Sequence, residues 1–287
     1  MKTGFHGIGS RRNTYNYLNR YVMQFDFGEN WLGFSQHALT PEKVAQAKQD
    51  FSILIKGIDL LNRSFLDVGF GQGLTLLAAS EMGASVIGND INPKCIRALE
   101  QNVQFFPSVS LPDIPVVIGS ILDNAVVGEL MEKSPGREGY DIVHSWGVLH
   151  HTGDMKKAIQ NTASMVRPGG HLILALYNRH WTSPVWLIIK WLYCKSPQII
   201  KKIMVVALFP IIYGAKFIVT GKNPKKQSRG MDFYYDVIDW VGGYPYEYAA
   251  IGEMEPFISL MGFKKIKSIS AQVPTGCNEF IFEKKKF

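Results

Sequence analysis

Three glycines at alternate positions mark the first place where the residue pattern predicts chemistry. Gly69, Gly71 and Gly73 follow the acidic Asp67 at the end of an apolar run, and a helix is predicted over 74–82. Glycine lets the backbone turn tightly and lets a ligand approach closely, while the first turn of a helix offers unpaired N–H groups. A dinucleotide fingerprint would place a further glycine at position 74, where this chain has leucine. The pattern therefore favours a ligand other than a dinucleotide.

Polar side chains also follow the second and fourth predicted strands. Asp90 ends the second strand, 17 residues after Gly73, where a carboxylate can accept hydrogen bonds from both hydroxyls of a ribose. His150 and His151 follow the fourth strand. A histidine with an ordinary pKa of ~6.5 suits a general base that removes a hydroxyl proton. We favour His151 as this base, because Leu149-His150 is expected to continue a packed apolar turn.

Apolar runs that alternate with helix signals predict the elements that hold these residues. Residues 1–39 are aromatic-rich and predicted to be irregular, and Thr40 and Pro41 are the expected N-cap and first residue of a helix. Strands are predicted at 64–69, 84–90, 115–119, 141–145, 170–177, 263–270 and 278–284, and helices at 74–82, 92–106, 122–133, 155–166 and 253–261. This order is typical of a doubly wound α/β fold, whose mostly parallel sheet is covered on both faces.

Residues 181–230 interrupt that alternation. They contain three tryptophans and long aliphatic runs, broken by lysines and by Pro210 and Gly214. The longest run therefore falls short of the ~20 apolar residues that a membrane span requires. Lysines beside tryptophan and aliphatic side chains suit a helix lying at a membrane surface, and they suit equally a lid over the site or a dimer contact.

Composition sets limits on the partners and the location. The chain has 287 residues, a net charge of +7 and 46% hydrophobic residues, which indicates a folded protein and raises the weight of an anionic partner. Its three cysteines have no metal-ligand spacing, so no metal is expected. The N-terminus lacks the apolar core of a signal peptide, and the expected location is cytoplasmic, with peripheral contact at the inner membrane face through 184–220 as an alternative.

The glycine loop after the first strand resembles motif I of class I S-adenosylmethionine-dependent methyltransferases. Tyr140-Asp141-Ile142-Val143 leading into Val148-Leu149-His150-His151, and Arg167-Pro168-Gly169-Gly170 leading into the fifth strand, are similar to the ubiquinone-biosynthesis-type members. The order and spacing of these blocks over residues 60–180 make the match specific. Segments 30–31, 239–247 and 276–280 resemble a bacterial branch whose acceptors are mostly unassigned. One departure is that Phe70 and Gln72 replace the smaller or more polar residues common in motif I.

The resemblance implies a seven-stranded methyltransferase fold in a single domain of residues 1–287. Residues 1–60 would form a helical cap, 61–180 the cofactor-binding core, 181–247 a hydrophobic lid and 248–287 the last helix and two strands. The cofactor would be S-adenosylmethionine and the product S-adenosylhomocysteine. The residues expected to contact the cofactor are Asp67, Gly69, Phe70, Gly71, Gly73, Asp90, Ile91, Ser120, Ile121 and Trp146.

The function implied is O-methylation of a small molecule, a sugar or a lipid-linked intermediate. His151 is the first candidate for the base, followed by His150, while Asp239 and Glu247 could orient it or bind the acceptor. RNA methylation is supported only by positive charge, and the Asn-Pro-Pro-Tyr type of signature is absent after Asn178, so a nucleic-acid partner is disfavoured. A cofactor-binding scaffold without catalysis is the non-enzyme alternative. A homodimer remains open.

Overall fold

A seven-stranded mixed sheet forms the centre of the protein. The computed structural model describes residues 23–225 and 231–286. The strand order is β3-β2-β1-β4-β5-β7-β6, which confirms the fold class expected from the sequence. The strands are β1 (Ser64–Val68), β2 (Ser85–Asp90), β3 (Val116–Ile118), β4 (Tyr140–Trp146), β5 (Val166–Tyr177), β6 (Phe263–Ile269) and β7 (Cys277–Lys284).

Five neighbouring strands run parallel, and β7 and β6 extend the sheet beyond β5. Leu66 of β1 is in register with Ile87 of β2 on one side and with Val143 of β4 on the other. β7 runs antiparallel to both β5 and β6. The parallel strands β1, β2, β3, β4 and β5 therefore end at one edge of the sheet, which is where ligands bind in open α/β folds.

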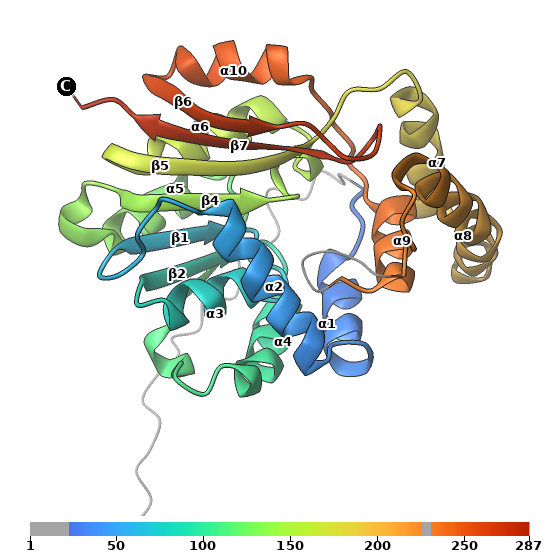
Figure 1. The fold of residues 1–287 in the computed structure, drawn as a ribbon, viewed down its shortest axis with the longest axis horizontal. Coiled ribbons are helices and arrows are strands. Elements are labelled where there is room, and N and C mark those ends of the chain that lie inside the picture. The colour runs from blue at the N-terminus through green and yellow to red at the C-terminus, as the bar shows by residue number, and fades with distance from the viewer. Residues whose placement is uncertain (1–22, 226–230, 287) are drawn as a thin grey trace, which may run out of the picture.

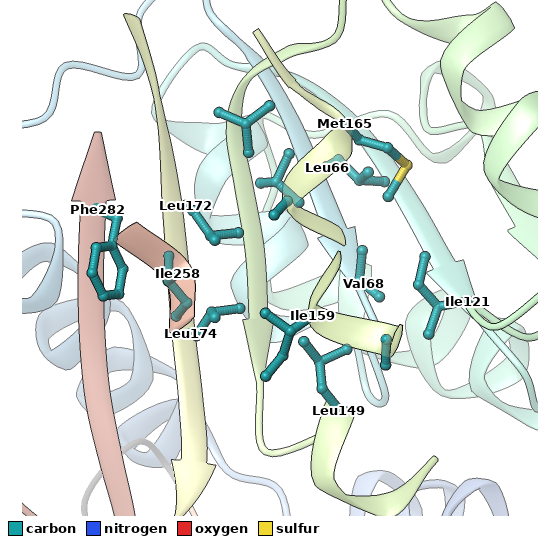
Figure 2. Packing of buried hydrophobic residues seen from close by; sticks show 14 of the residues in the cluster. Leu66, Val68, Ile121, Leu149, Ile159, Met165, Leu172, Leu174, Ile258 and Phe282 are labelled. Carbon is teal, nitrogen blue, oxygen red and sulfur yellow. The ribbon is translucent and has the colours of Figure 1, made fainter. Parts of the chain in front are cut away.

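Helices cover both faces because the strands are apolar on both sides. One face carries α2 (Pro41–Leu54), α3 (Leu74–Glu81) and α4 (Lys94–Asn102). The other carries α5 (Asn124–Lys133), α6 (Met155–Ser164) and α10 (Ile251–Ser259). Figure 2 shows the second core, where Leu66, Val68, Leu172 and Leu174 of the sheet lie beside Ile159 and Ile258 of the helices.

The N-terminal part of the chain is more regular than expected. Thr40 caps α2 by accepting the Lys43 N–H, and Pro41 is its first residue, as predicted. The prediction that residues 1–39 are irregular is wrong over α1 (Phe27–His37). This helix begins where the Asp26 side chain accepts the Glu29 N–H, and it packs against α4 and α9 (Phe233–Gly242). Glycine and aromatic residues interrupt the amphipathic pattern of this short helix, and the sequence pattern therefore does not indicate it.

Residues 181–247, which contain the insertion and α9, form three helices at the ligand-binding end of the sheet. α7 (Ser183–Lys195), α8 (Gln198–Thr220) and α9 lie together beyond the ends of the parallel strands, at the right of Figure 1. Met204, Leu208, Phe209, Ile212 and Tyr213 of α8 pack against a cluster that includes Phe233, Val237 and Val241 of α9. The segment 181–247, which the sequence predicts to be a lid, contains these helices, apart from 226–230, which lie outside the described residues; its role as a lid stays a prediction.

The expectation that the apolar run of the insertion is broken short of a membrane span is wrong. α8 continues through Pro210 for 23 residues with a mean hydropathy of 2.1, and 6% of its most apolar window is buried. Proline removes one backbone hydrogen bond, and the packing on α9 before and after Pro210 keeps the two halves in one helix. By length and composition, α8 alone among the described helices is long and apolar enough to cross a membrane.

Candidate functional site

A large cavity of about 1880 Å³ opens at the edge where the parallel strands end. Its walls come from the loops after β1, β2, β3 and β4, from residues of β7 and the loop before it, and from the insertion helices. Phe25, Phe27 and Trp31 contribute from the N-terminal segment. The sheet therefore supplies one side of the cavity, and segments distant in sequence supply the other.

The glycine loop after β1 is held in a conformation that only glycine adopts easily. Gly69 and Gly71 have φ values of 75° and 56° and both line the cavity. A Cβ on Gly69 would lie 2.4 Å from the methyl carbons of Val148, and one on Gly71 would lie 3.2 Å from the Trp31 ring. At these two positions a side chain would crowd Val148 and Trp31, so the loop presents its backbone to the cavity there.

Gly73 has a different part in the same loop. It is the left-handed N-cap of α3, with φ 82°, and a Cβ there would lie 2.4 Å from Leu99 Cδ1 of α4. Gly73 does not line the cavity, unlike Phe70 and Gln72, which do. This glycine therefore serves the close packing of α3 on α4, and its predicted contact with the cofactor has no support in the cavity lining.

Asp90 ties the end of β2 to the glycine loop. Its Oδ2 accepts the Gly71 N–H at 3.0 Å and its Oδ1 accepts the Asn92 N–H at 2.9 Å. Burial raises the pKa of Asp90, and these two N–H donors act against that rise. Each carboxylate oxygen can accept a second hydrogen bond, and both Asp90 and Ile91 line the cavity.

Asp67 lies deeper than Asp90 and is engaged with a neighbouring strand. Its Oδ1 lies 2.7 Å from Nδ1 of His144 on β4, and both side chains are buried. The His144 ring stacks between Phe65 and Trp146. Asp67 lines the cavity, and its contact with His144 links β1 to β4.

The third and fourth strands complete the side of the cavity nearest the sheet. Ser120 and Ile121 follow β3 and line the cavity, where Ser120 Oγ accepts the Leu122 N–H at 3.2 Å. Trp146, at the end of β4, also lines it. The structure thus brings nine of the ten residues predicted to contact the cofactor, all but Gly73, to one cavity.

The two candidate histidines have different surroundings. His151 lines the cavity, and its Nδ1 lies 2.6 Å from the Pro245 carbonyl oxygen, so this nitrogen is the protonated donor. Its Nε2 is left as a hydrogen-bond acceptor. His150 does not line the cavity: its Nδ1 accepts the Tyr177 N–H, and its ring packs 3.9 Å from the Tyr177 ring.

Burial changes the proton affinity expected for these histidines. Desolvation, assisted by the positive charge of Lys190, lowers the pKa of His151 to about 3. Desolvation followed by the charges of His151 and Lys190 lowers the pKa of His150 well below its usual value. The pKa of His151 thus lies well below the ordinary value of ~6.5 assumed from the sequence, and burial favours the neutral ring.

Asp239 of α9 is the third candidate, and it lines the cavity. Its Oδ1 is buried and has no hydrogen-bond partner within the described residues. Burial raises the pKa of Asp239 to about 7, against the opposing charge of Lys190. Glu247 lies elsewhere: it accepts the Met155 N–H at the start of α6 and does not line the cavity.

Sequence reasoning missed Lys190 and the aromatic residues around it. Lys190 is completely buried on α7, and its ammonium lies over the rings of Tyr177, Trp240 and Tyr246. The one signal for it in the sequence is a single lysine within the apolar run 185–193. Lysine side chains are usually exposed to solvent, so the lysines of the insertion do not indicate that one of them is buried.

A family model described as a methyltransferase domain matches residues 37–207. Among curated proteins, the chain is similar to the ubiquinone biosynthesis O-methyltransferase of Cupriavidus pinatubonensis, with 26% identity over 42% of this chain and 44% of that protein. The same enzyme of Aliivibrio fischeri is 27% identical over 45% of this chain and 50% of that protein. The match thus spans about half the length of these curated relatives.

Solved structures show the same fold. An O-methyltransferase family protein from Burkholderia thailandensis superposes with a TM-score of 0.52 at 13% identity, covering 85% of this chain and 57% of that one. Magnesium protoporphyrin IX methyltransferase from Synechocystis, solved with bound S-adenosylhomocysteine, gives a TM-score of 0.50 at 16% identity, covering 85% and 84%. At these identities the likeness concerns the fold alone.

The buried histidines predict a specific loss of stability in acid. The unfolded chain takes up protons on histidine below about pH 6.5, whereas folded His151 does so only near its pKa of about 3. Between these values the unfolded state binds more protons, so the free energy of unfolding falls as pH falls, by up to ~1.4 kcal/mol per pH unit for each histidine.

Urea unfolding at about pH 7 and about pH 5 measures this loss. His151→Gln should reduce the difference between the two pH values, because glutamine does not titrate. Because Asp239, whose pKa burial raises to about 7, contributes with the opposite sign over this range, the decisive comparison is between the two proteins. The same change in unfolding free energy in the unmodified protein and in His151→Gln would show that His151 is not held neutral.

Proposed function

The chain belongs to the methyltransferase domain family of class I, S-adenosylmethionine-dependent enzymes, and from this premise we propose that it methylates an oxygen of a small-molecule acceptor. The observation that carries this proposal is the composition of the cavity. The glycine loop and Asp90 line one part of it, and His151 and Asp239 line another. A cofactor site and proton-accepting groups thus share one enclosed space.

The residues around the glycine loop fit the cofactor. The exposed backbone of Gly69 and Gly71 suits the methionine moiety, and Asp90 retains acceptor capacity for the ribose hydroxyls. Ser120, Ile121 and Trp146 border the position expected for the adenine. When bound, S-adenosylmethionine supplies an electrophilic methyl group on a sulfonium centre.

We assign the proton-accepting role to Asp239 in preference to His151. A general base works best when its pKa lies near the operating pH, and burial raises the pKa of Asp239 to about 7, whereas that of His151 is lowered to about 3. His151 keeps its Nε2 as an acceptor, because its Nδ1 is committed to Pro245. In this arrangement His151 orients the acceptor hydroxyl and Asp239 removes its proton as the methyl group is transferred.

The aromatic and apolar walls of the cavity favour an acceptor with carbon-rich surface. Trp186, Trp240 and Tyr177 line the part of the cavity near Asp239 and His151. We propose a small organic molecule, which includes a sugar or a lipid-linked intermediate. RNA methylation has no comparable support, because the groups facing the cavity include the carboxylates Asp90, Asp236 and Asp239.

The cofactor assignment predicts which ligands bind. S-adenosylmethionine and S-adenosylhomocysteine should both bind in a calorimeter, and NAD should not. Asp90→Ala should weaken the affinity by ~1–3 kcal/mol, about 5–150-fold, because ribose hydroxyls lose their acceptor and the Gly71 N–H is left unpaired. Asp113→Ala, at an exposed position, is the control and should bind normally. Tight binding of NAD alone would overturn the assignment.

The assignment of the base predicts both a rate and a pH dependence. With an acceptor found by a labelled-methyl screen, the maximal rate should rise with pH through about 7 as Asp239 loses its proton. Asp239→Asn should lower that rate by ~10²–10⁴-fold and remove the pH dependence, without changing cofactor affinity. Near-normal turnover in Asp239→Asn would return the role to His151 or leave catalysis to alignment alone.

We further propose that the outer faces of α7 and α8 contact an anionic membrane surface from the cytoplasmic side. The exposed side chains of α8 include Ile199, Ile203, Val206 and Ile218, the last two 73% and 82% exposed. Lys201 and Lys202 lie near one end of the helix and Lys222 and Lys225 follow the other. Apolar side chains flanked by lysines match the apolar and charged layers of a membrane surface.

Charge favours a membrane over a second copy of the chain. No acidic residue occurs between Asp154 and Asp232, so two copies paired through α8 would bring lysines together. A full crossing of the membrane is also disfavoured, because Lys216 of α8 is paired with Asp236 of α9 at 2.7 Å and the inner face of α8 lines the cavity. A helix lying in the interface keeps those contacts.

Vesicle sedimentation tests the membrane contact. The protein should co-sediment with vesicles of phosphatidylcholine and phosphatidylglycerol at about 0.05 M salt and be released at about 0.5 M salt, because salt screens the attraction of lysines to anionic lipid. Val206→Asp together with Ile218→Asp should abolish sedimentation. Leu260→Asp, at an 89% exposed leucine on the distant end of α10, should not. A protein that does not co-sediment with the vesicles at low salt and forms a dimer in solution would overturn the proposal.

A further inference from the structure

Lys190 is the most deeply buried charged side chain near the cavity. Packing alone does not explain why a charged residue occupies this position. Lys190 is 0% exposed, in the middle of α7. Its ammonium donates to the Trp240 carbonyl oxygen and lies 4.4, 4.8 and 5.5 Å from the ring centres of Trp240, Tyr246 and Tyr177. Three ring faces and one carbonyl thus surround the ammonium.

The ammonium needs a negative charge to balance it, and α9 offers two. A buried charge without a partner is strongly destabilising, whereas a carbonyl and ring faces compensate only part of the lost hydration. Asp236 is already paired with Lys216 at 2.7 Å. Asp239 directly precedes Trp240, the residue whose carbonyl accepts from the ammonium, and its charge is the largest that opposes the lowering of the Lys190 pKa.

The two side chains act on each other without direct contact. Within the described residues, no ion pair or hydrogen bond joins Lys190 to Asp239, because the ammonium is turned toward the Trp240 carbonyl and the rings. The Asp239 carboxylate borders the cavity and its buried Oδ1 has no partner there. A charge that stabilises the carboxylate from a distance leaves its oxygens available to a ligand.

We propose that Lys190 is a positioning residue that favours the ionised form of Asp239 while leaving the buried Oδ1 of its carboxylate free to accept a hydrogen bond from the acceptor hydroxyl. This inference rests on the proposed methyl transfer, in which Asp239 accepts a proton. An ordinary ion pair would occupy the carboxylate, and an isolated carboxylate at this depth would be protonated. The Trp240 carbonyl and three aromatic side chains hold the ammonium, and no ion pair between Lys190 and Asp239 occurs within the described residues, so both of these states are avoided.

The charge states of Lys190 and Asp239 depend on the titratable groups that surround them. Burial lowers the pKa of Lys190 to about 7, and nearby acidic groups oppose that change. The same positive charge lowers the pKa of both His150 and His151. The groups concerned are His150 and His151 beside β4, Tyr177 of β5, Cys194 of α7, Asp236 and Asp239 of α9, Tyr246 after α9 and Cys277 of β7.

The protonation of Asp239 can be measured without an acceptor. Carboxyl-carbon NMR of protein labelled on aspartate, with the signal assigned through Asp239→Asn, follows the ionisation of this group directly. In Lys190→Met, a chain of similar length without charge, the midpoint should move upward by about 1–3 pH units. Lys195→Met is the matched control, because Lys195 lies on the same helix over the Trp191 ring but is exposed. Its midpoint should equal that of the unmodified protein.

The outcomes separate this inference from the proposed function. An unchanged Asp239 midpoint in Lys190→Met would overturn the role of Lys190, whether or not the cofactor binds. If Lys190→Met does not fold, the NMR titration of Asp239 in the unmodified protein is the test. An Asp239 that remains protonated at about pH 8 would contradict the proposal. Absence of S-adenosylhomocysteine binding in the unmodified protein would instead remove the methyltransferase proposal and leave the NMR result standing.

With an acceptor available, catalysis gives a second readout. The pH profile of the maximal rate in Lys190→Met should move upward by the same amount as the Asp239 midpoint, and cofactor affinity should be unchanged. Lys190→Arg keeps the charge and should leave the Asp239 midpoint near its original value. A rate lowered equally at every pH would show that Lys190 only supports packing.

Discussion

Parallel pairing of β1 with β2 and β4 is the constraint on which the rest of the molecule depends. Because these strands end at one edge, the backbone of the glycine loop, Asp90 and Trp146 all reach the same space although they lie far apart in the sequence. That edge exposes loop backbone and several polar groups. Helices α1, α7, α8 and α9 lie at this edge (Figure 1), and residues of the N-terminal segment and of α7, α8 and α9 line the cavity together with the loops that follow the strands.

Enclosure in turn determines the chemistry of the ionisable groups. A histidine after β4 would be an ordinary base in water, but burial beneath the insertion lowers the pKa of His151 to about 3. The same burial raises the pKa of Asp239 to about 7, where a carboxylate becomes a useful base. One physical change, the loss of water, thus weakens one candidate base and strengthens the other, with Lys190 acting on both.

The parts of the site that could be predicted from sequence are those fixed by local geometry. The turn at Gly69 and Gly71 needs positive φ, and Asp90 falls at a strand end, so residue type and spacing were sufficient to locate both. The burial of Lys190 and the surroundings of His151 depend on which helix covers the sheet edge, and that information is spread over segments separated by tens of residues. Periodicity likewise could not show that α8 continues past Pro210, because the packing on α9 that supports it is a tertiary contact.

Helix α8 links the cavity to the outer surface of the protein. Ile212, Ala215 and Val219 line the cavity, while Val206 and Ile218 face outward. One helix therefore forms both part of the cavity wall and an apolar outer face. An acceptor with an apolar tail would meet matching surface on both sides of this helix. A helix that only covered the cavity would need apolar side chains on its inner face alone. Contact with apolar surroundings on both faces would explain why α8 is apolar on its outer face as well.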